Sequence, residues 1–377
     1  MIYFNNPSER QVQCMKKYRV GVIGATGMVG QRFVTLLENH PWFELKAVAA
    51  SARSAGKTYG EAISGRWLLN IPCPEEAKKL IVLDAADVET VAAQVDFVFC
   101  AISATKEETR KLEEAYAKAE TPVVSNNSAC RGVADVPMLI PEINHAHTAV
   151  IAAQRKRLGT ERGFIAVKPN CSIQSYVPAL TPLLPYGIEK ISVCTYQAIS
   201  GASKTFETFP EIIDNVIPYI GGEEEKSEQE PLKIWGSLNV DGTAIVPTAQ
   251  PVISAQCLRV AASDGHMAAV SVSFKRKPGF QEMLDAWASW KTLPQELGLP
   301  SAPNPFVRYM TEDNRPQTKL DRDFERGMGV SVGRLRPDCI FDWRFVCLSH
   351  NTLRGAAGGG VLSAELLCAQ NYIQHKD

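Results

Sequence analysis

The chain has 377 residues, of which 45% are hydrophobic and 21% charged, and a formal net charge of −1. This length predicts two domains or more. The balanced charge argues against nucleic acid or an anionic membrane as a partner, and no apolar run approaches the length of a membrane span.

Residues 1–17 are polar, lack an apolar signal core, and are expected to form a loose N-terminal extension. The ten cysteines show no CxxC pair and no zinc-like spacing with histidine, so we expect no metal site. Scattered cysteines of this kind are typical of reduced thiols in a cytoplasmic protein.

The first motif follows a buried strand expected at residues 18–23. The turn at residues 24–30 reads Gly-Ala-Thr-Gly-Met-Val-Gly, and a helix is expected over 31–38. A glycine-rich turn between strand and helix indicates a dinucleotide site, although the spacing is GxxGxxG and a tight turn without a ligand is the alternative. The cofactor contacts predicted here are Gly24, Thr26, Gly27, Met28 and Val29.

A second strand is expected at residues 43–50, and no acid follows it. An NAD site usually carries an acid there for the ribose hydroxyls. Ser51, Arg53 and Ser54 are suited instead to the 2′-phosphate of NADP. A solvated loop arginine is the alternative interpretation.

Three further strands are expected at residues 80–83, 95–100 and 122–125. Ser103 follows the second of these, as a further expected cofactor contact, and Thr105 and Glu108 form a capping box for a helix over 106–118. Arg131 ends a polar loop, 126–131, at a strand's carboxyl end, where ligands gather in parallel sheets. The alternation of strands and helices predicts an α/β, Rossmann-type doubly wound domain.

The stretch Lys168-Pro169-Asn170-Cys171-Ser172 joins a strand expected at 164–167 to a helix expected at 173–180. This context places Cys171 near a helix N-terminus, where free N–H groups and the helix dipole favour a thiolate. A thiolate is the nucleophilic form of cysteine, so the position suits covalent catalysis. A small buried hydrophobic residue is the alternative.

The second half of the chain is expected to form an α+β domain with a mainly antiparallel sheet, at residues 172–352. Strands are expected at 191–199, as a hairpin at 252–260 and 266–275, and as a second hairpin at 329–335 and 340–348. A last helix, 360–373, is expected to pack back onto the first domain, which then comprises 18–171 and 353–377.

With these motifs together, the chain resembles the aspartate-β-semialdehyde dehydrogenase family, in its fungal and archaeal branch. The resemblance runs from about Arg19 onward and rests on six motifs in the family's order, at 24–30, 168–172, 196–201, 223–226, 259–266 and 351–359. It implies a glyceraldehyde-3-phosphate dehydrogenase-like second domain and reductive dephosphorylation of β-aspartyl phosphate to aspartate semialdehyde with NADPH. That reaction belongs to lysine, threonine and methionine biosynthesis.

The resemblance also implies a role for individual residues. Cys171 would form a thioester with release of phosphate, and Gln197 would position the substrate. His266 has a pKa range suited to a proton shuttle, Asn170 is a candidate oxyanion donor, and Arg259 is a bidentate clamp for the substrate carboxylate. The remaining substrate contacts would be Glu223 for the amino group, with Glu224 and Glu225 as alternatives, and Lys226 and Arg131 for the phosphate. Asn351 and Gly358 would approach the nicotinamide.

Three alternatives stay open. One is a related NADP-dependent acyl-phosphate or acyl-CoA reductase, like malonyl-CoA reductase or N-acetyl-glutamyl-phosphate reductase. Another is a glyceraldehyde-3-phosphate dehydrogenase-type enzyme, which the missing acid and the cysteine context disfavour. The third is a catalytically silent NADP-binding module, which the presence of both Cys171 and His266 disfavours. The family resemblance implies a homodimer or homotetramer.

Overall fold

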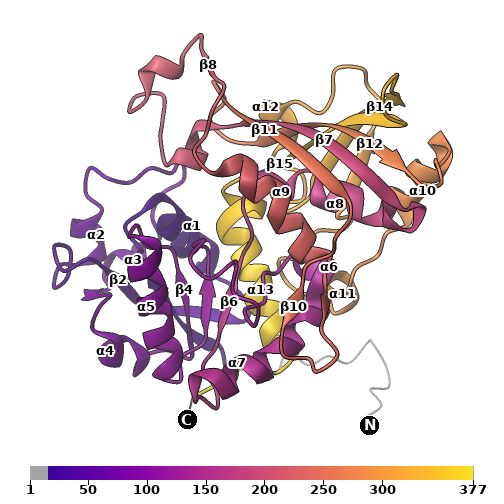
Figure 1. The fold of residues 1–377 in the computed structure, drawn as a ribbon. Helices are drawn as coiled ribbons and strands as arrows, with labels where there is room; N and C mark the ends of the chain where they lie inside the picture. Colours follow the sequence, from indigo (N-terminus) through magenta and orange to yellow (C-terminus); the bar gives the residue numbers. More distant parts are fainter. Residues whose placement is uncertain (1–15, 377) are drawn as a thin grey trace, which may run out of the picture.

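The computed structural model describes residues 16–376, so most of the expected extension at 1–17 lies outside the described residues. Two sheets organise the molecule. One has six strands in the order β3-β2-β1-β4-β5-β6, and the other has seven in the order β13-β14-β15-β12-β7-β11-β8. Figure 1 shows them in two lobes, with the yellow helix α13 between them.

The six-stranded sheet confirms the expected Rossmann-type domain. Its strands are β1 (Tyr18–Ile23), β2 (Phe43–Ala50), β3 (Val82–Asp84), β4 (Phe97–Cys100), β5 (Val123–Ser125) and β6 (Ile165–Val167). Every pairing is parallel. The strand order reverses between β1 and β4, and a ligand crevice is expected outside the carboxyl ends of strands at such a switch point.

Helices of different lengths connect these strands. They are α1 (Met28–Leu37), α2 (Tyr59–Ala62), α3 (Glu75–Lys78), α4 (Val88–Ala92), α5 (Lys106–Lys118), α6 (Pro141–Asn144), the 3₁₀ helix η1 (His145–Val150) and α7 (Ile151–Leu158). The capping box of Thr105 and Glu108 on α5 is confirmed. Helix α1 begins three residues earlier than expected, directly after Gly27.

The helix expected after Cys171 is wrong in part, because the chain there is divided. A three-residue 3₁₀ turn, η2 (Ser172–Gln174), precedes the short helix α8 (Val177–Leu180) and a second 3₁₀ turn, η3 (Thr181–Tyr186). Pro178 explains the break, because it has no N–H to bond to the carbonyl of Gln174 and is tolerated only in the first turn of a helix, where it stands in α8.

The seven-stranded sheet is mainly antiparallel, as expected. Its strands are β7 (Ile188–Gln197), β8 (Val216–Ile217), β11 (Val252–Val260), β12 (His266–Phe274), β13 (Val307–Met310), β14 (Val330–Pro337) and β15 (Trp343–Ser349). The predicted hairpin of β14 and β15 is confirmed. Pairs β7–β11 and β13–β14 are parallel.

The other predicted hairpin is wrong, because β11 and β12 do not pair with each other. Strand β7 lies between them, parallel to β11 and antiparallel to β12. The connecting segment crosses the end of β7, where Ile199 N donates to Ala262 O at 2.9 Å. A short polar connection can join two adjacent strands or cross an intervening strand. The turn signal alone therefore does not determine whether β11 and β12 pair.

The remaining elements surround this sheet. They are the 3₁₀ turns η4 (Ile199–Ala202) and η5 (Pro210–Ile212), helix α9 (Glu223–Ile234), the small ribbon of β9 (Ser237–Leu238) and β10 (Ile245–Val246), and helices α10 (Phe280–Ser289), α11 (Leu293–Glu296) and α12 (Thr318–Asp321). Helix α9 packs along β11, facing the first domain's loops.

The chain returns to the first domain through a π-helical segment, η6 (Leu353–Ala357), and helix α13 (Gly358–Ala369). Val361, Ala364 and Leu367 join the core around β1 and β4, which confirms that the last helix packs on the first domain. Leu362 and Leu366 pack instead with Leu299 and Met328. We propose that one domain comprises residues 18–171 and 353–377 and that the other comprises residues 172–352.

No helix within residues 16–376 is both long enough and apolar enough to cross a membrane.

Candidate active site

Two predicted catalytic residues meet between the lobes. Cys171, just beyond β6, places its Sγ 3.4 Å from Nε2 of His266, the first residue of β12. Ala198 N donates to His266 Nδ1 at 3.0 Å. Because Nδ1 accepts this bond, the neutral ring carries its proton on Nε2 and directs it at the sulfur.

His266 is fully buried, and burial lowers its pKa well below the ordinary value, with Arg259 and His350 adding to the effect. A buried imidazole avoids the charged form unless a partner compensates it. The ring is therefore neutral near pH 7. This differs from the titration near pH 6.5 on which the sequence argument for a proton shuttle rested.

The expectation that the local helix favours a Cys171 thiolate is not met. Burial raises the pKa of the Cys171 thiol to about 11, with a further rise from Glu223, while Lys168, Arg131 and Arg259 oppose it. Only a three-residue turn follows Cys171, so its dipole is too weak to offset this burial. In the free protein the resting form is the thiol.

Arg259 and His266 converge although their strands are not neighbours. Arg259 Nη1 donates to Ala198 O at 2.7 Å, beside the Ala198 N–H that holds His266. A Cβ atom added at Gly201 would lie 2.9 Å from Arg259 Nη1 and 3.0 Å from His266 Nε2. Glycine at position 201 thus keeps the space above both side chains open.

Glu223 is the acid of α9 that faces the site. Its carboxylate accepts from Asn170 Nδ2 at 2.9 Å, Gln197 Nε2 at 3.3 Å and Lys226 Nζ at 2.8 Å. Glu224 instead accepts from the backbone N–H of Cys257, and Glu225 is exposed. Of the three glutamates the sequence left open, Glu223 has the suitable position.

Asn170 holds the nucleophile turn. Its Oδ1 accepts from Ser172 N and Ser172 Oγ, both at 2.7 Å. Its Nδ2 is directed at Glu223, at 2.9 and 3.0 Å from the two carboxylate oxygens. In this arrangement the amide N–H groups of Asn170 bind Glu223. To donate to an oxyanion, as expected, the amide must exchange Glu223 for the oxyanion.

Arg131 lies near this cluster and is paired with Glu230, a residue that the sequence interpretation missed. Arg131 Nη1 donates to Glu230 Oε1 at 2.9 Å. Lys233, also missed, donates to the carbonyl oxygen of Arg131 at 2.7 Å. Both missed residues continue the face of α9 that begins at Glu223, so helical spacing alone could have indicated them.

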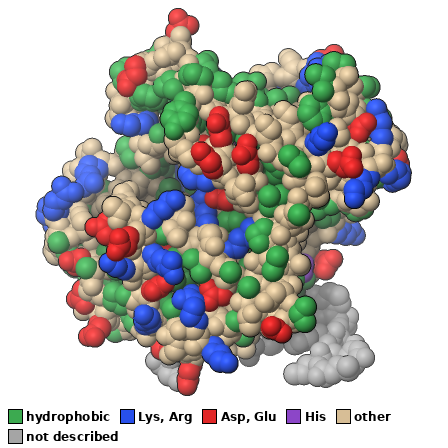
Figure 2. Space-filling model, in the orientation of Figure 1, with side chains coloured by type: hydrophobic (Ala, Val, Ile, Leu, Met, Phe, Trp, Pro, Cys, Tyr) green, Lys and Arg blue, Asp and Glu red, His purple; other side chains and the backbone are tan. Residues whose placement is uncertain are grey.

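A pocket of about 440 Å³ opens at the switch point of the parallel sheet. Most of the predicted cofactor residues of the first turn line it, and so does Ser103. Its lining also includes residues not predicted, among them Arg66, Asn126, Asn127 and Ser203. In the space-filling view of Figure 2 a hollow separates the two lobes, with basic side chains along it.

The glycines of the turn fit a bound dinucleotide. A Cβ at Gly24 or Gly30 would meet backbone atoms at 2.4 and 2.1 Å, so the fold itself requires both. At Gly27 the nearest atom is 3.6 Å away, and this glycine lines the pocket. Its small size leaves room for a ligand approaching the start of α1, where free N–H groups bind phosphate.

Other predicted cofactor residues lie outside this pocket. Ser51, Arg53 and Ser54 form a turn after β2, closed by Ser54 N donating to Ser51 O at 2.9 Å, and Arg53 is exposed. Arg66 is the basic side chain in the lining, on a segment anchored by Gln31, whose Nε2 donates to Arg66 O at 2.8 Å. No local sequence signal distinguished Arg66.

Asn351 and Gly358 lie where the chain returns to the first domain. Asn351 Oδ1 accepts from Gly265 N and its Nδ2 donates to Ser200 Oγ, both at 2.8 Å. Gly358 is buried, and a Cβ there would lie 2.6 Å from Met328 Sδ. Their contact with a nicotinamide stays a prediction.

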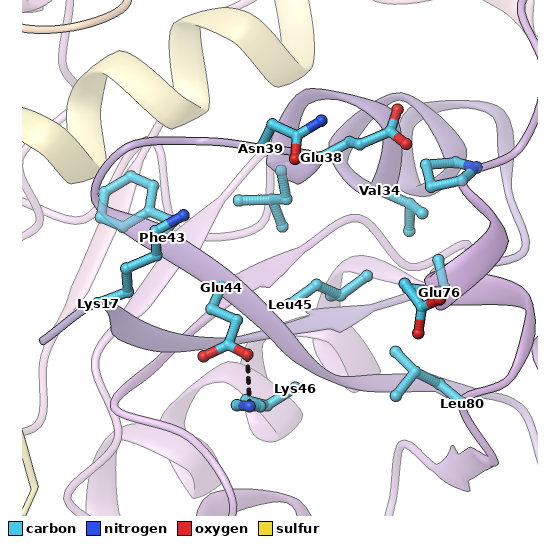
Figure 3. A pocket seen from close by; sticks show the side chains of 13 residues that line it. Lys17, Val34, Glu38, Asn39, Phe43, Glu44, Leu45, Lys46, Glu76 and Leu80 are labelled. Carbon is cyan, nitrogen blue, oxygen red and sulfur yellow. Dashed lines mark hydrogen bonds and ion pairs between the residues drawn. The ribbon is translucent and has the colours of Figure 1, made fainter.

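A second pocket, of about 450 Å³, lies between α1, β2 and α3 (Figure 3). Its lining combines apolar residues, such as Val34 and Leu45, with charged ones, such as Glu38, Glu44 and Lys46, and it shares no residue with the candidate site. The chemistry therefore concentrates in the hollow between the lobes.

Two family models match the chain, and together they define its class. The semialdehyde dehydrogenase NAD binding domain matches residues 19–151, and the semialdehyde dehydrogenase dimerisation domain matches residues 180–354. The class is thus a two-domain semialdehyde dehydrogenase that carries a nicotinamide-nucleotide domain, as the sequence motifs indicated.

Comparison with individual proteins identifies the family within this class. An aspartate-semialdehyde dehydrogenase of Aspergillus fumigatus is 42% identical, covering 95% of this chain and 99% of the relative. One from Methanothermobacter thermautotrophicus is 43% identical over 92% and 98%. The chain belongs to the aspartate-semialdehyde dehydrogenase family, with fungal and archaeal members among its relatives. A crystal structure of the Candida albicans enzyme with NADP superposes with a TM-score of 0.85 at 38% identity, covering 95% of this chain and 100% of that one.

Proposed function

We propose that the protein catalyses the NADPH-dependent reductive dephosphorylation of β-aspartyl phosphate to aspartate semialdehyde, in lysine, threonine and methionine biosynthesis. The observation that carries this proposal is the 3.4 Å approach of Cys171 Sγ to His266 Nε2 beside Glu223 and Arg259. Family membership over nearly the whole chain supports the substrate, and the NADP-bound relative supports the cofactor.

In this proposal Cys171 is the nucleophile. After its proton passes to solvent, the thiolate attacks the acyl carbon, the bond from that carbon to the phosphate oxygen breaks, and a thioester remains on Cys171. Bound NADPH supplies the hydride that reduces the thioester. The C–S bond then breaks, which returns the thiolate and releases the aldehyde.

His266 supports these steps as a neutral hydrogen-bond donor. Its Nε2–H points at the reacting centre because Ala198 N fixes Nδ1 as an acceptor. A donor placed in advance stabilises the sulfur anion and the oxygen anion formed on the substrate carbon. Neither the acyl transfer nor the reduction needs a net proton transfer by this ring.

The charged residues around the pair suit a small zwitterionic acyl phosphate. We assign Arg259 to the α-carboxylate and Glu223 to the amino group, with Gln197 positioning the acyl intermediate. Lys226 and Arg131 are assigned to the phosphate. Three of these residues, Glu223, Gln197 and Arg259, are buried. Their polar groups need hydrogen-bond partners, so a ligand that replaces the present partners is bound favourably.

The test is phosphate-dependent reduction of NADP by the purified protein with aspartate semialdehyde, followed at the nicotinamide absorbance. The expected result is a signal that needs phosphate and is lost after thiol alkylation. Activity only with a CoA thioester or a longer acyl phosphate would retain the cysteine chemistry and overturn the substrate.

We further propose that the protein works as a homodimer or homotetramer in the cytoplasm. The match to a dimerisation domain supports self-association. None of the nine cysteines described forms a disulfide, in keeping with a reducing compartment. Light scattering of the active protein tests the assembly, and a fully active monomer would contradict it.

A further inference from the structure

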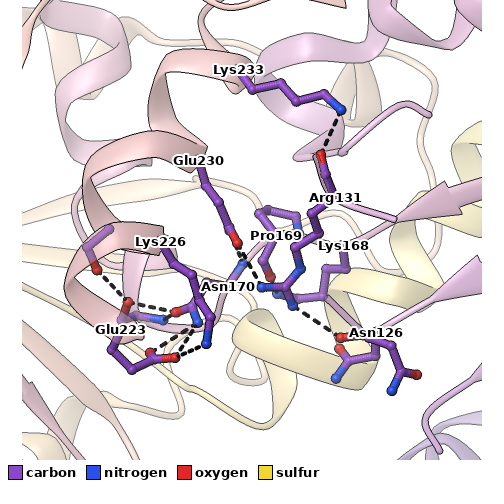
Figure 4. A network of polar contacts seen from close by, with 12 residues as sticks. Asn126, Arg131, Lys168, Pro169, Asn170, Glu223, Lys226, Glu230 and Lys233 are labelled. Atoms are coloured by element: carbon purple, nitrogen blue, oxygen red, sulfur yellow. Dashed lines mark hydrogen bonds and ion pairs between the residues drawn. The ribbon is translucent and has the colours of Figure 1, made fainter. Parts of the chain in front are cut away.

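One face of α9 contacts both the nucleophile turn and the loop of Arg131 (Figure 4). Its residues recur at helical spacing, at positions 223, 226, 227, 230 and 233, and all of them are buried except Lys226, which is half-buried. The first two are assigned above to the substrate. The last two, Glu230 and Lys233, have no assigned role, although both are buried.

Glu230 joins two parts of the site with separate oxygens. Its Oε1 accepts from Arg131 Nη1 at 2.9 Å, and its Oε2 accepts from the backbone N–H of Asn170 at 2.6 Å. The carboxylate thus fixes the guanidinium of Arg131 relative to the peptide that precedes Cys171.

Lys233 fixes the backbone of the same arginine. Its Nζ donates to the carbonyl oxygens of Arg131, Val133 and Val136 at 2.7, 2.7 and 3.0 Å. Burial lowers the pKa of Lys233 to about 8, and three carbonyl acceptors favour the ammonium form, so the side chain is charged near pH 7. Arg131 is therefore held at its side chain by Glu230 and at its main chain by Lys233.

Arg131 keeps donors for a ligand while held in this way. Glu230 and the carbonyl of Asn126 engage one N–H on each terminal nitrogen. Arg131 Nε is buried and has no hydrogen-bond partner among the described residues, so the donors left for a ligand are the second N–H on each terminal nitrogen. Since a guanidinium offers five N–H groups, an oxyanion can bind without displacing Glu230.

We propose that Glu230 and Lys233 are positioning residues for the phosphate subsite, which set Arg131 at a fixed place relative to Cys171. This inference rests on the proposed function, because it concerns the phosphate that leaves during acyl transfer. It adds to that function the residues through which α9 couples phosphate binding to the nucleophile turn.

The Glu230→Gln variant tests the inference in the full-length protein. A glutamine has one acceptor oxygen, so its NH₂ group must face a donor at either Arg131 or Asn170. We expect the KM for phosphate to rise about tenfold or more, while the KM for NADP stays within about twofold. Equal rises in both constants, or no rise in either, would overturn it.

Two further variants make the comparison specific. Glu225→Gln removes an exposed glutamate of the same helix and should leave both constants unchanged. Glu230→Asp keeps the charge on a shorter side chain and should recover part of the phosphate affinity. It also tests the inference if Glu230→Gln fails to fold, because an unchanged phosphate KM in Glu230→Asp would count against a distance-sensitive role.

A measurement without turnover separates this inference from the proposed function. Inorganic phosphate should protect Cys171 from iodoacetamide, and Glu230→Gln should need about tenfold more phosphate for the same protection. If aspartate semialdehyde is not a substrate but this shift occurs, only the function fails. If turnover occurs and the protection curve does not shift, only the inference fails.

Discussion

Gly355 packs so closely on Cys171 that a Cβ atom at position 355 would lie 2.9 Å from the Cβ of Cys171. Gly355 belongs to the π-helical segment η6, and its N–H donates to His350 O at 2.8 Å, so the segment cannot easily retreat. The nucleophile is thus positioned from behind by main chain that comes from the other end of the sequence.

We therefore expect Gly355→Ala to displace Cys171 and lower kcat about a hundredfold, because misplacement by about 1 Å has effects of that size. Steady-state kinetics check this expectation. Gly279→Ala, at an exposed position before α10, is the control and should keep kcat. A Gly355→Ala enzyme with ordinary kcat would contradict close packing as the reason for glycine.

Cys171→Ser should abolish turnover and leave NADPH binding unchanged. A serine hydroxyl keeps the size of the thiol and removes the nucleophile. Fluorescence titration with NADPH measures binding separately from activity. Loss of binding together with activity would show that Cys171 is a structural residue.

The reactivity of Cys171 should depend on pH and on Glu223. With the pKa of its thiol raised to about 11, the alkylation rate by iodoacetamide should still be rising at pH 9 to 10. Glu223→Gln removes a negative charge that disfavours the thiolate, so the pKa should fall and the rate at pH 8 should increase. Glu225→Gln is the control, and an unchanged profile in Glu223→Gln would exclude this electrostatic effect.

Selectivity for NADP tests two arginines against each other. Arg53→Ala should raise the KM for NADP and leave that for NAD unchanged, if Arg53 binds the 2′-phosphate. Arg66 lines the pocket and Arg53 does not, so Arg66→Ala is the matched comparison. If only Arg66→Ala raises the KM for NADP selectively, the 2′-phosphate is assigned to Arg66 instead of Arg53.

A buried ion pair should be important for stability. Arg354 donates to both oxygens of Glu142, each at 2.6 Å, and its Nε donates to Gln174 just beyond Cys171. Glu142→Gln leaves a buried guanidinium without its counter-charge and should lower the free energy of unfolding by about 3–5 kcal/mol.

Urea denaturation measures this loss. The control is Glu107→Gln, which breaks the exposed pair with Lys111 and should cost about 1 kcal/mol or less. Equal losses in the two variants would show that burial of the Arg354–Glu142 pair has no special importance.

The parallel sheet and its motifs were readable from the sequence, because each signal there is local. The bounds expected for the strands that became β1 and β2, and for the helix that became α5, agree with the structure. Each depends on a run of buried side chains, a glycine turn or a capping box within a few residues.

The arrangement of the second sheet could not be read in the same way. Placing β7 between β11 and β12 depends on pairings between residues far apart in the chain, which no local turn signal encodes. The raised pKa of Cys171 is similar, since it comes from burial and from Glu223, 52 residues later (223 − 171). For Glu230, helical spacing from Glu223 indicates the face of α9 on which it lies, but its partners, Arg131 and Asn170, lie on other segments and could not be predicted locally.

The order of synthesis has a consequence for how the molecule is completed. Phe33 and Phe99 emerge early from the ribosome, yet a surface they form is covered by Gly360 and its neighbours on α13, near the end of the chain. The first domain is therefore the first part of the chain to be synthesised, but its core is complete only when α13 has been made. A nascent chain stalled near residue 354 would contain both family-matched segments and still expose an apolar face to chaperones.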